Sequence, residues 1–230
     1  MILVIAAMEE EYQELEKFLH HKQAAESFGI KYHLGELENK EVMLLLSGVG
    51  KVNAARALTT IMNNFAIDFI INIGSAGGIV NEHQVKPLDI VFAKKVCYHD
   101  VDLTLANRLP GVLPGLPQYF ETALNEKLLA GLNELALTYH YATIASGDQF
   151  VCELDKVAYI TKTFIDVCAV DMEAAAIAHL CYLKEIPFIV LRSISDVINE
   201  KSDNQMQFEE YIKQASHNSA LAAKKIIELL

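Results

Sequence analysis

Short apolar runs alternate along the chain with longer segments in which apolar residues recur at helical spacing. Runs rich in Ile, Val and Leu predict strands at residues 2–7, 32–37, 42–46, 69–73, 90–96, 141–145, 169–172 and 188–194. Helical spacing predicts helices at residues 9–19, 51–64, 120–137, 156–163, 173–182 and 207–230. Continuous apolar strands that alternate with helices are typical of an α/β fold with a largely parallel sheet, buried on both faces.

The alternation is continuous, without a linker, a low-complexity stretch or an internal repeat, so we expect residues 1–230 to form a single domain. Residues 107–117 differ from the rest because they hold three prolines and two glycines among apolar residues. This composition excludes regular structure and predicts a stiff apolar loop. Such a loop usually covers a site or a partner subunit.

Composition limits the partners that the chain can bind. Hydrophobic residues make up 52% of the sequence and the formal net charge is −11, which favours a large core and opposes binding to nucleic acid or to an anionic membrane. The apolar start is short and runs into three glutamates, unlike a signal peptide, and no run approaches the roughly 20 apolar residues of a membrane span. We therefore expect a cytoplasmic protein.

The four cysteines show no metal-binding or disulfide spacing. Cys97, Cys152, Cys168 and Cys181 all lie in apolar surroundings and are predicted to be reduced core thiols. The segment that starts at His99 offers metal ligands, but strand alternation would point His99 and its neighbouring aspartate to opposite faces. We predict no bound metal and no cofactor.

Three acidic residues sit where apolar runs stop. Glu11 follows the first run, Glu173 follows residues 169–172, and Asp196 follows residues 188–194. Because the carboxyl ends of strands border one crevice in an open α/β sheet, we expect these side chains to converge. Each also has a simpler interpretation, as an acid that starts a helix or ends a strand. Converging carboxylates suit proton transfer and the binding of hydroxyl groups on a neutral or cationic substrate.

Glycine-rich segments accompany these acids. Residues 47–51 resemble part of a phosphate-binding loop but lack the full pattern, and a tight strand-to-helix turn is the simpler interpretation. Residues 74–78 lack the dinucleotide-binding fingerprint, yet glycines there allow the backbone to approach a flat ligand. Phe150 follows a glycine turn and suits either stacking on a base or core packing.

Taken in order, these motifs resemble those of the 5′-methylthioadenosine/S-adenosylhomocysteine nucleosidases, in the nucleoside phosphorylase-like superfamily. The resemblance spans nearly the whole chain, through residues 7–11, 47–51, 74–78, 98–100, 146–148, 172–173 and 193–197. It implies a three-layer αβα sandwich around a mixed, largely parallel twisted sheet, and a homodimer. It also implies hydrolysis of the N-glycosidic bond of 5′-methylthioadenosine and S-adenosylhomocysteine, with 5′-deoxyadenosine as a further substrate.

The resemblance assigns roles to residues of this chain. Glu11 would activate the attacking water, Asp196 would protonate adenine N7, and Ser195 would position Asp196. Glu173 would hold the ribose hydroxyls. The remaining substrate contacts that the resemblance implies are Met172 against the sugar, Phe150 stacked on adenine, the Val151 backbone at the edge of the base, a lining of Met8, Val49, Ser75, Ala76 and Gly77, and Arg192 near the site.

The chain departs from the family pattern at two places. Asp171 stands where a glutamate is common, which keeps the charge. In family members the proline-rich loop often carries aromatic residues that reach the neighbouring subunit's pocket. By the resemblance, those positions hold Ala106 and Arg108 in this chain, while Pro114 keeps the proline. Arg108 would favour a longer, carboxylate-bearing 5′ substituent or would point to solvent, so the preference among substrates stays open.

Two rival interpretations remain. A nucleoside phosphorylase of the same superfamily would need a cationic phosphate site, against which the acidic residues 9–11 argue. A nucleoside-binding protein without activity would not need Glu11, Glu173 and Asp196 together. Release of adenine, and its dependence on phosphate, separates the three.

Overall fold

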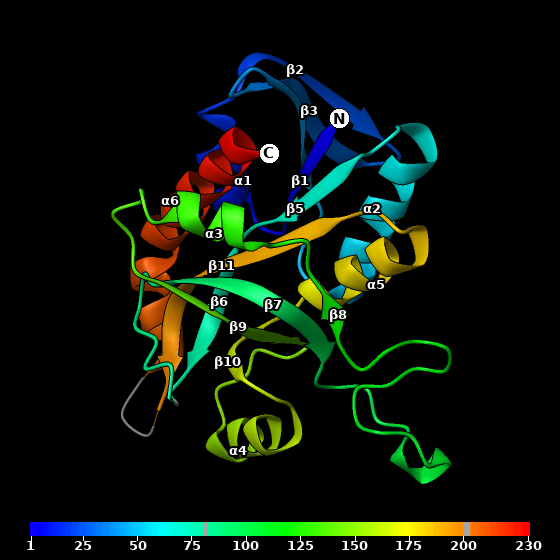
Figure 1. The fold of residues 1–230 in the computed structure, drawn as a ribbon, viewed down its shortest axis with the longest axis vertical. Helices are drawn as coiled ribbons and strands as arrows, with labels where there is room; N and C mark the ends of the chain where they lie inside the picture. Colours follow the sequence, from blue (N-terminus) through cyan, green and yellow to red (C-terminus); the bar gives the residue numbers. More distant parts are fainter. Residues whose placement is uncertain (81, 200–202) are drawn as a thin grey trace.

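The structure, a computed structural model, describes residues 1–80, 82–199 and 203–230. Within these residues eleven strands form one mixed sheet (Figure 1). The strands are β1 (Ile2–Ala6), β2 (His20–Ser27), β3 (Ile30–Leu37), β4 (Lys40–Leu46), β5 (Phe69–Asn72), β6 (Ser75–Ile79), β7 (Ile90–Tyr98), β8 (Phe120–Glu121), β9 (Tyr139–Ser146), β10 (Val167–Asp171) and β11 (Phe188–Ile198). The helices are α1 (Glu9–Glu16), α2 (Lys51–Asn64), α3 (Glu126–Leu132), α4 (Leu154–Thr163), α5 (Ala174–Lys184) and α6 (Asn204–Leu229), with a 3-10 turn, η1 (Thr104–Ala106).

Parallel strands form the centre of the sheet. The order is β2-β3-β4-β1-β5-β11-β6-β10-β9-β7-β8, in which β1 is parallel to β4 and β5, and β11 is parallel to β5 and β6. Strand β11 also pairs with β7, in the antiparallel sense. This second pairing closes β11, β6, β10, β9 and β7 into a ring of hydrogen-bonded strands.

Helices cover the sheet on both faces, which confirms the predicted three-layer arrangement. Helices α2 and α5 lie on one face, where Leu58 and Ile177 are fully buried. Helices α1, α3 and α6 lie on the other, where Leu15, Leu132 and Ile226 are fully buried. Each such side chain contributes about 1.5–3 kcal/mol when it leaves water.

The continuous helix expected at residues 120–137 is wrong. Phe120 instead begins the short strand β8 and pairs with Val96 of β7. Asn125 then starts α3, because its side chain accepts a hydrogen bond from the backbone N–H of Leu128. Pairing across the chain, together with this N-cap, replaces the first half of the predicted helix.

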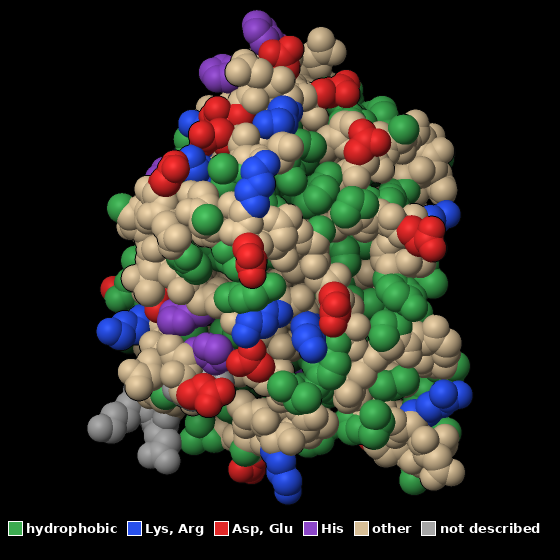
Figure 2. Space-filling view, viewed as in Figure 1, with side chains coloured by type: hydrophobic (Ala, Val, Ile, Leu, Met, Phe, Trp, Pro, Cys, Tyr) green, Lys and Arg blue, Asp and Glu red, His purple; other side chains and the backbone are tan. Residues whose placement is uncertain are grey.

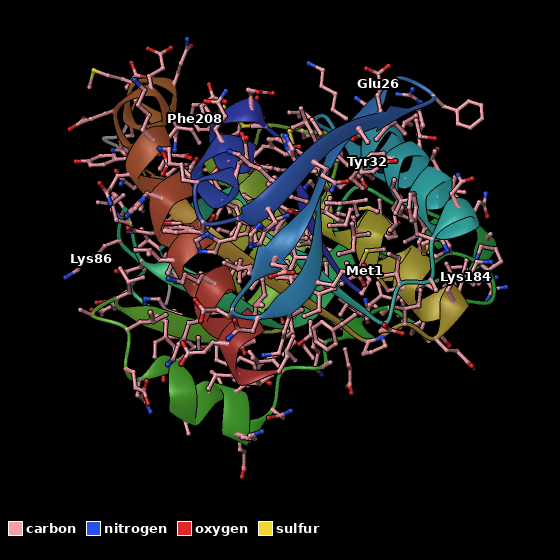
Figure 3. All side chains as sticks on the ribbon, turned by 90° about the horizontal axis from the view of Figure 1, so that it is seen from above. Met1, Glu26, Tyr32, Lys86, Lys184 and Phe208 are labelled. Carbon is pink, nitrogen blue, oxygen red and sulfur yellow. The ribbon has the colours of Figure 1, made fainter. Side chains whose placement is uncertain are left out.

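Strands β2 and β6 were not predicted. β2 is an exposed, polar edge strand that pairs with β3; Figure 3 looks down on this hairpin, in which Glu26 is exposed and Tyr32 is buried. An edge strand without an apolar face leaves no periodic signal. β6 occupies the glycine-rich segment 74–78, for which no strand was predicted. It packs between β11 and β10, where a Cβ on Gly78 would lie 2.9 Å from Val85.

The cysteines are free thiols, as expected, but they do not all belong to the core. Cys97, Cys168 and Cys181 are buried, and burial raises the pKa of Cys168 and Cys181 to about 12. Cys152 is exposed, so the prediction of a core position is wrong for this residue. It lies in the loop after β9, which faces solvent.

The surface shows charges of both signs. On the face in Figure 2, Lys and Arg side chains are interspersed with Asp and Glu. Among the described residues, no helix is both long and apolar enough to span a membrane.

Candidate active site

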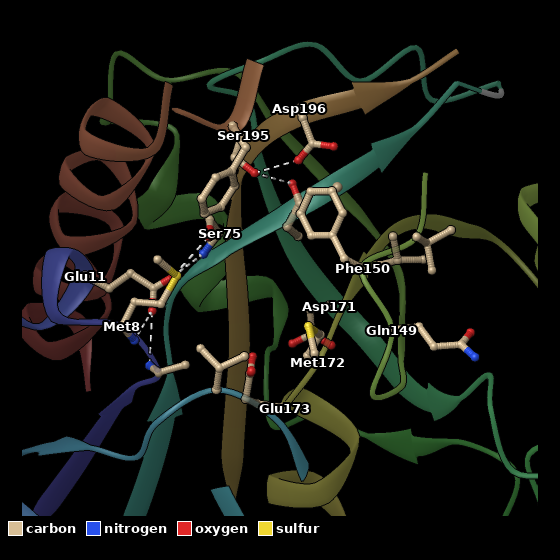
Figure 4. Close-up of a pocket in the computed structure, with 17 residues that line it drawn as sticks. Met8, Glu11, Ser75, Gln149, Phe150, Asp171, Met172, Glu173, Ser195 and Asp196 are labelled. Atoms are coloured by element: carbon tan, nitrogen blue, oxygen red, sulfur yellow. Dashed lines mark hydrogen bonds between the residues drawn. The ribbon is translucent and has the colours of Figure 1, made fainter. Parts of the chain in front are cut away.

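One cavity of about 290 Å³ lies where the carboxyl ends of several strands meet the helices that follow them (Figure 4). It is bordered by the turn between β1 and α1, the start of α2, strand β6, the turn between β10 and α5, strand β11 and the first turns of α6. The lining residues are Ala7, Met8, Glu11, Val49, Ser75, Ala76, Gly77, Gln149, Phe150, Val151, Val170, Asp171, Met172, Glu173, Ser195, Asp196 and Phe208.

Most residues predicted from the sequence meet at this cavity. Glu11, Glu173 and Asp196 enter it from three separate elements, as Figure 4 shows. Arg192 is buried but does not line the cavity. Three predicted residues do not line the cavity of their own chain. They lie on the exposed loop between β7 and β8 and are Ala106, Arg108 and Pro114.

Glu11 is held by four donors. Its Oε2 accepts hydrogen bonds from the backbone N–H groups of Ala7 and Met8, both at 3.1 Å. Its Oε1 accepts from Ser75, from the backbone at 2.9 Å and from the hydroxyl at 3.1 Å. Burial raises the pKa of Glu11, while the Arg192 charge and these hydrogen bonds oppose the rise. Gly74 is required here, since a Cβ there would lie 2.9 Å from Oε1.

Glu173 lies at the start of α5 and reaches across to α2. Its Oε1 accepts a hydrogen bond of 2.8 Å from the backbone N–H of Gly50, which leaves Oε2 for a ligand. Burial and the nearby Asp171 charge raise the pKa of Glu173 to about 8, and Arg192 opposes the rise. The N-terminus of α2 favours a negative charge at this place.

Arg192 forms a buried ion pair behind the cavity. Its Nη2 donates to Asp171 Oδ2 at 2.5 Å and to Asn72 Oδ1 at 2.6 Å. Its Nε also donates to Asp171, and its Nη1 donates to the carbonyls of Asn72 and Leu191. All five guanidinium N–H groups therefore have protein acceptors. Arg192 acts on the cavity through its charge, which faces Glu11 and Glu173.

Asp196 belongs to β11, so the prediction that the strand ends before it is wrong. The register between β11 and β6 shifts between Ile194 and Asp196, and this irregularity turns adjacent side chains toward one site. The Ser195 hydroxyl donates to Asp196 Oδ1 at 2.8 Å, and the Asn204 amide donates to Oδ2 at 2.7 Å. Burial raises the pKa of Asp196, while the Asn204 and Ser195 donors oppose the rise.

Sequence reasoning missed two residues contributed by α6. The ring of Phe208 lies 6.0 Å from that of Phe150 at an interplanar angle of 89°, so the two aromatics border one side of the cavity edge to face. Asn204 binds Asp196. Asn204 precedes the predicted helix 207–230 and Phe208 lies at its start, and neither belongs to a motif that would single it out in the sequence.

The loop that carries Phe150 is fixed by an ion-pair network. Lys51 Nζ lies 2.5 Å from Asp100 Oδ2, which also accepts the backbone N–H of Asp148 at 2.9 Å. Asp148 Oδ1 in turn accepts the backbone N–H of Lys51 at 2.8 Å. Burial alone would raise the pKa of Asp100, but the hydrogen bonds from Lys51 and from the Asp148 backbone lower it. The network ties the loop after β9 to the start of α2.

A group of residues with metal-like spacing lies away from the cavity. Within the described ranges, Glu82, His83 and Asp166 bring ligand atoms within 4.8 Å of one another, whereas His99 forms no such group. Lys94 Nζ lies 3.1 Å from Asp166, so an ammonium already supplies positive charge there.

Comparisons with known proteins agree with this geometry. The sequence model of the phosphorylase superfamily matches residues 1–230. A 5′-methylthioadenosine/S-adenosylhomocysteine nucleosidase of Bacillus pumilus is 39% identical, over 98% of this chain and 97% of its own length. A crystal structure of a Borrelia burgdorferi protein bound to adenine is 39% identical, covers both chains fully and superposes with a TM-score of 0.93.

A further solved structure comes from a relative with another name. A mutant of the futalosine hydrolase of Helicobacter pylori is 30% identical, over 100% of this chain and 99% of that chain, with a TM-score of 0.92. The chain belongs to the phosphorylase superfamily and, within it, to the 5′-methylthioadenosine/S-adenosylhomocysteine nucleosidase family. It is an enzyme of the glycosidic hydrolase class.

Proposed function

We propose that this enzyme hydrolyses the N-glycosidic bond of 5′-methylthioadenosine and S-adenosylhomocysteine, and also of 5′-deoxyadenosine, and releases adenine. The observation that carries the proposal is the placement of Glu11 and Asp196, two buried carboxyl groups from distant segments, in one cavity with Glu173. The relative from Bacillus pumilus and the adenine complex of the Borrelia protein support it.

The reaction divides between two carboxyl groups. Glu11 as a carboxylate takes a proton from water while the water oxygen forms a bond to C1′ of the ribose. The C1′–N9 bond breaks, its electron pair moves onto adenine, and Asp196 donates a proton to N7 of the base. The sugar carries oxocarbenium character in between, which nearby carboxylates stabilise. Glu173 Oε2 accepts the ribose hydroxyls.

Ser75 must change its hydrogen bond for this step to occur. A carboxylate offers about four lone-pair sites, and four protein donors contact Glu11. Three of these donors are backbone N–H groups and are fixed. The Ser75 hydroxyl rotates, so it is the donor that can yield its place to the attacking water.

Hydrolysis fits the cavity better than phosphorolysis does. Among the described lining residues there is no Lys or Arg, and the guanidinium of Arg192 is fully engaged by protein acceptors. A phosphate dianion would lie beside Glu11 and Glu173 without a counter-charge of its own.

The 5′ substituent is proposed to meet a second copy of the chain. Leu105 is fully exposed and Leu109 is 63% exposed on the apolar loop between β7 and β8. In a homodimer this loop would reach the partner's cavity and bring Arg108 near the substituent. Sedimentation velocity of the wild type and of Leu105→Asp tests this, because a monomeric wild type would contradict it.

One set of parallel incubations tests the reaction. The protein is mixed in phosphate-free buffer with 5′-methylthioadenosine, S-adenosylhomocysteine, 5′-deoxyadenosine, futalosine and inosine in separate samples, and the products are identified by chromatography and mass spectrometry. We expect free adenine from the first three. Turnover that requires phosphate would replace the proposal by phosphorolysis, and futalosine as the best substrate would move the chain toward its Helicobacter pylori relative.

A further inference from the structure

The first residue of α6 reaches the carboxyl group at one end of the cavity. Asn204 is 7% exposed, and its Nδ2 lies 2.7 Å from Asp196 Oδ2. The helix is capped by its neighbour Asp203, whose side chain accepts the backbone N–H of Met206 at 3.0 Å. Since Asp203 satisfies the helix end, the Asn204 amide is available for Asp196.

Asp196 has only neutral partners among the described residues. Ser195 and Asn204 each donate to one of its oxygens, and strand β6 faces it with Ala76 and Gly77. The charged groups that line the same cavity are Glu11 from α1, Asp171 from β10 and Glu173 from the turn before α5. Arg192 of β11 lies behind the cavity and pairs with Asp171. None of these four groups contacts Asp196.

We propose that Asn204 is a positioning residue that makes Asp196 a stronger acid toward the departing base, an inference that rests on the proposed nucleosidase reaction. As the proton leaves Asp196, negative charge develops on its oxygens. A hydrogen bond from the Asn204 amide to Oδ2 therefore strengthens as the reaction proceeds and stabilises the transition state more than the bound substrate.

An amide suits both protonation states of Asp196. Toward the carboxylate, Asn204 donates through Nδ2, and toward the carboxylic acid it accepts through Oδ1 after a half-turn of the side chain. A leucine at this position would do neither. An aspartate would force two carboxyl groups to share a proton, because both cannot ionise at this separation.

The same stretch of α6 offers a matched control. Gln207 Oε1 accepts the backbone N–H of Val197 at 3.0 Å, so it also ties α6 to β11, but it does not contact Asp196. Gln207→Leu and Asn204→Leu each remove one amide from the same helix–strand contact. A difference between them reports on Asp196 and not on how the helix packs.

The test is a pH profile of adenine release from 5′-methylthioadenosine, measured for the wild type, Asn204→Leu, Asn204→Asp and Gln207→Leu. For Asn204→Leu we expect kcat to fall about 10- to 100-fold, as for loss of a hydrogen bond to a charged group, with KM little changed because Asn204 does not line the cavity. The alkaline limb of kcat/KM, where Asp196 loses its proton, moves to higher pH. Asn204→Asp moves it further, and Gln207→Leu leaves it in place.

The outcomes separate the two proposals. Absence of adenine release by the wild type overturns the proposed function. Release by the wild type, combined with Asn204 variants whose rates fall by one factor at every pH, or fall no more than that of Gln207→Leu, overturns the role of Asn204. Thermal unfolding identifies a variant that does not fold, and in that case the isosteric Asn204→Asp decides by its alkaline limb.

Discussion

The two ends of the cavity hold their carboxyl groups in opposite ways. At the end with Glu11 and Glu173, the buried Arg192–Asp171 pair supplies charge, and the donors to Glu11 are mostly fixed backbone N–H groups. At the other end, Asp196 has no charged partner among the described residues, and its donors are two side chains that can turn. The Arg192 charge and the fixed donors favour a carboxylate at Glu11, whereas burial and the Asp171 charge favour a proton on Glu173. The isolation of Asp196 and its adaptable donors suit a group that releases a proton and regains it.

The largest effect is expected from removing the proton that Asp196 donates. Asp196→Asn should reduce kcat about 10²- to 10⁴-fold, the usual contribution of general acid catalysis. The fold should remain, because Ser195 and Asn204 can each reverse their hydrogen bonds to an amide. Adenine release and thermal unfolding measure the two effects, and near-normal turnover would remove Asp196 from the reaction.

Glu11→Gln tests whether the donors to Glu11 are fixed, in contrast to the side-chain donors to Asp196. The amide would place an N–H group against backbone N–H groups, either those of Ala7 and Met8 or that of Ser75. We therefore expect a similar loss of kcat and, in addition, a loss of about 1–3 kcal/mol in the free energy of unfolding. Urea denaturation compares this variant with Asp196→Asn, and equal stabilities would contradict the proposed difference between the two ends.

Removing the Arg192 guanidinium breaks the buried ion pair beside Glu11 and Glu173. Arg192→Leu leaves Asp171 buried without its partner and should lower the free energy of unfolding by about 3–5 kcal/mol. The double variant Asp171→Leu/Arg192→Leu should recover much of this loss. A double variant that is no more stable than Arg192→Leu would show that the pair is not the cause.

The pH dependence of stability tests burial of Glu173. Burial raises the pKa of Glu173 in the fold to about 8, above the ordinary glutamate value of 4.5, so the folded protein holds the proton more tightly. Stability from this group is complete below pH 4.5 and declines as the pH rises toward 8. Glu173→Gln should match the wild type near pH 4.5 and have the higher melting temperature at pH 8–9. Equal melting temperatures at both values would contradict the raised pKa.

The smallest effect is expected from the ion-pair network that fixes the loop carrying Phe150. Lys51→Met removes the ion pair with Asp100 but leaves the backbone hydrogen bond from residue 51 to Asp148. For a partly exposed pair we expect KM to rise about two- to fivefold, with kcat unchanged. A fall in kcat alone, without a change in KM, would mean that this network acts on the chemical step.

The sequence allowed most of this architecture to be predicted, and the failures have physical causes. Glu11 and Glu173 were found because each follows a buried strand, a relation that is local in the chain. The exposed strand β2 has no apolar periodicity, and β8 depends on pairing with residues far away in sequence. Asn204 was missed because its partner belongs to another element, strand β11, and only the folded chain brings the two together.

The ring formed by β11, β6, β10, β9 and β7 has a consequence for motion. A strand in a closed ring cannot fray from an edge, so exposing the amides of β11 requires several strands to separate at once. The amide proton of Ser193, which lies where β11 pairs with both β6 and β7, should therefore exchange with solvent deuterium only in rare, large-scale openings. The polar edge strand β2, which pairs on one side only, should exchange far sooner.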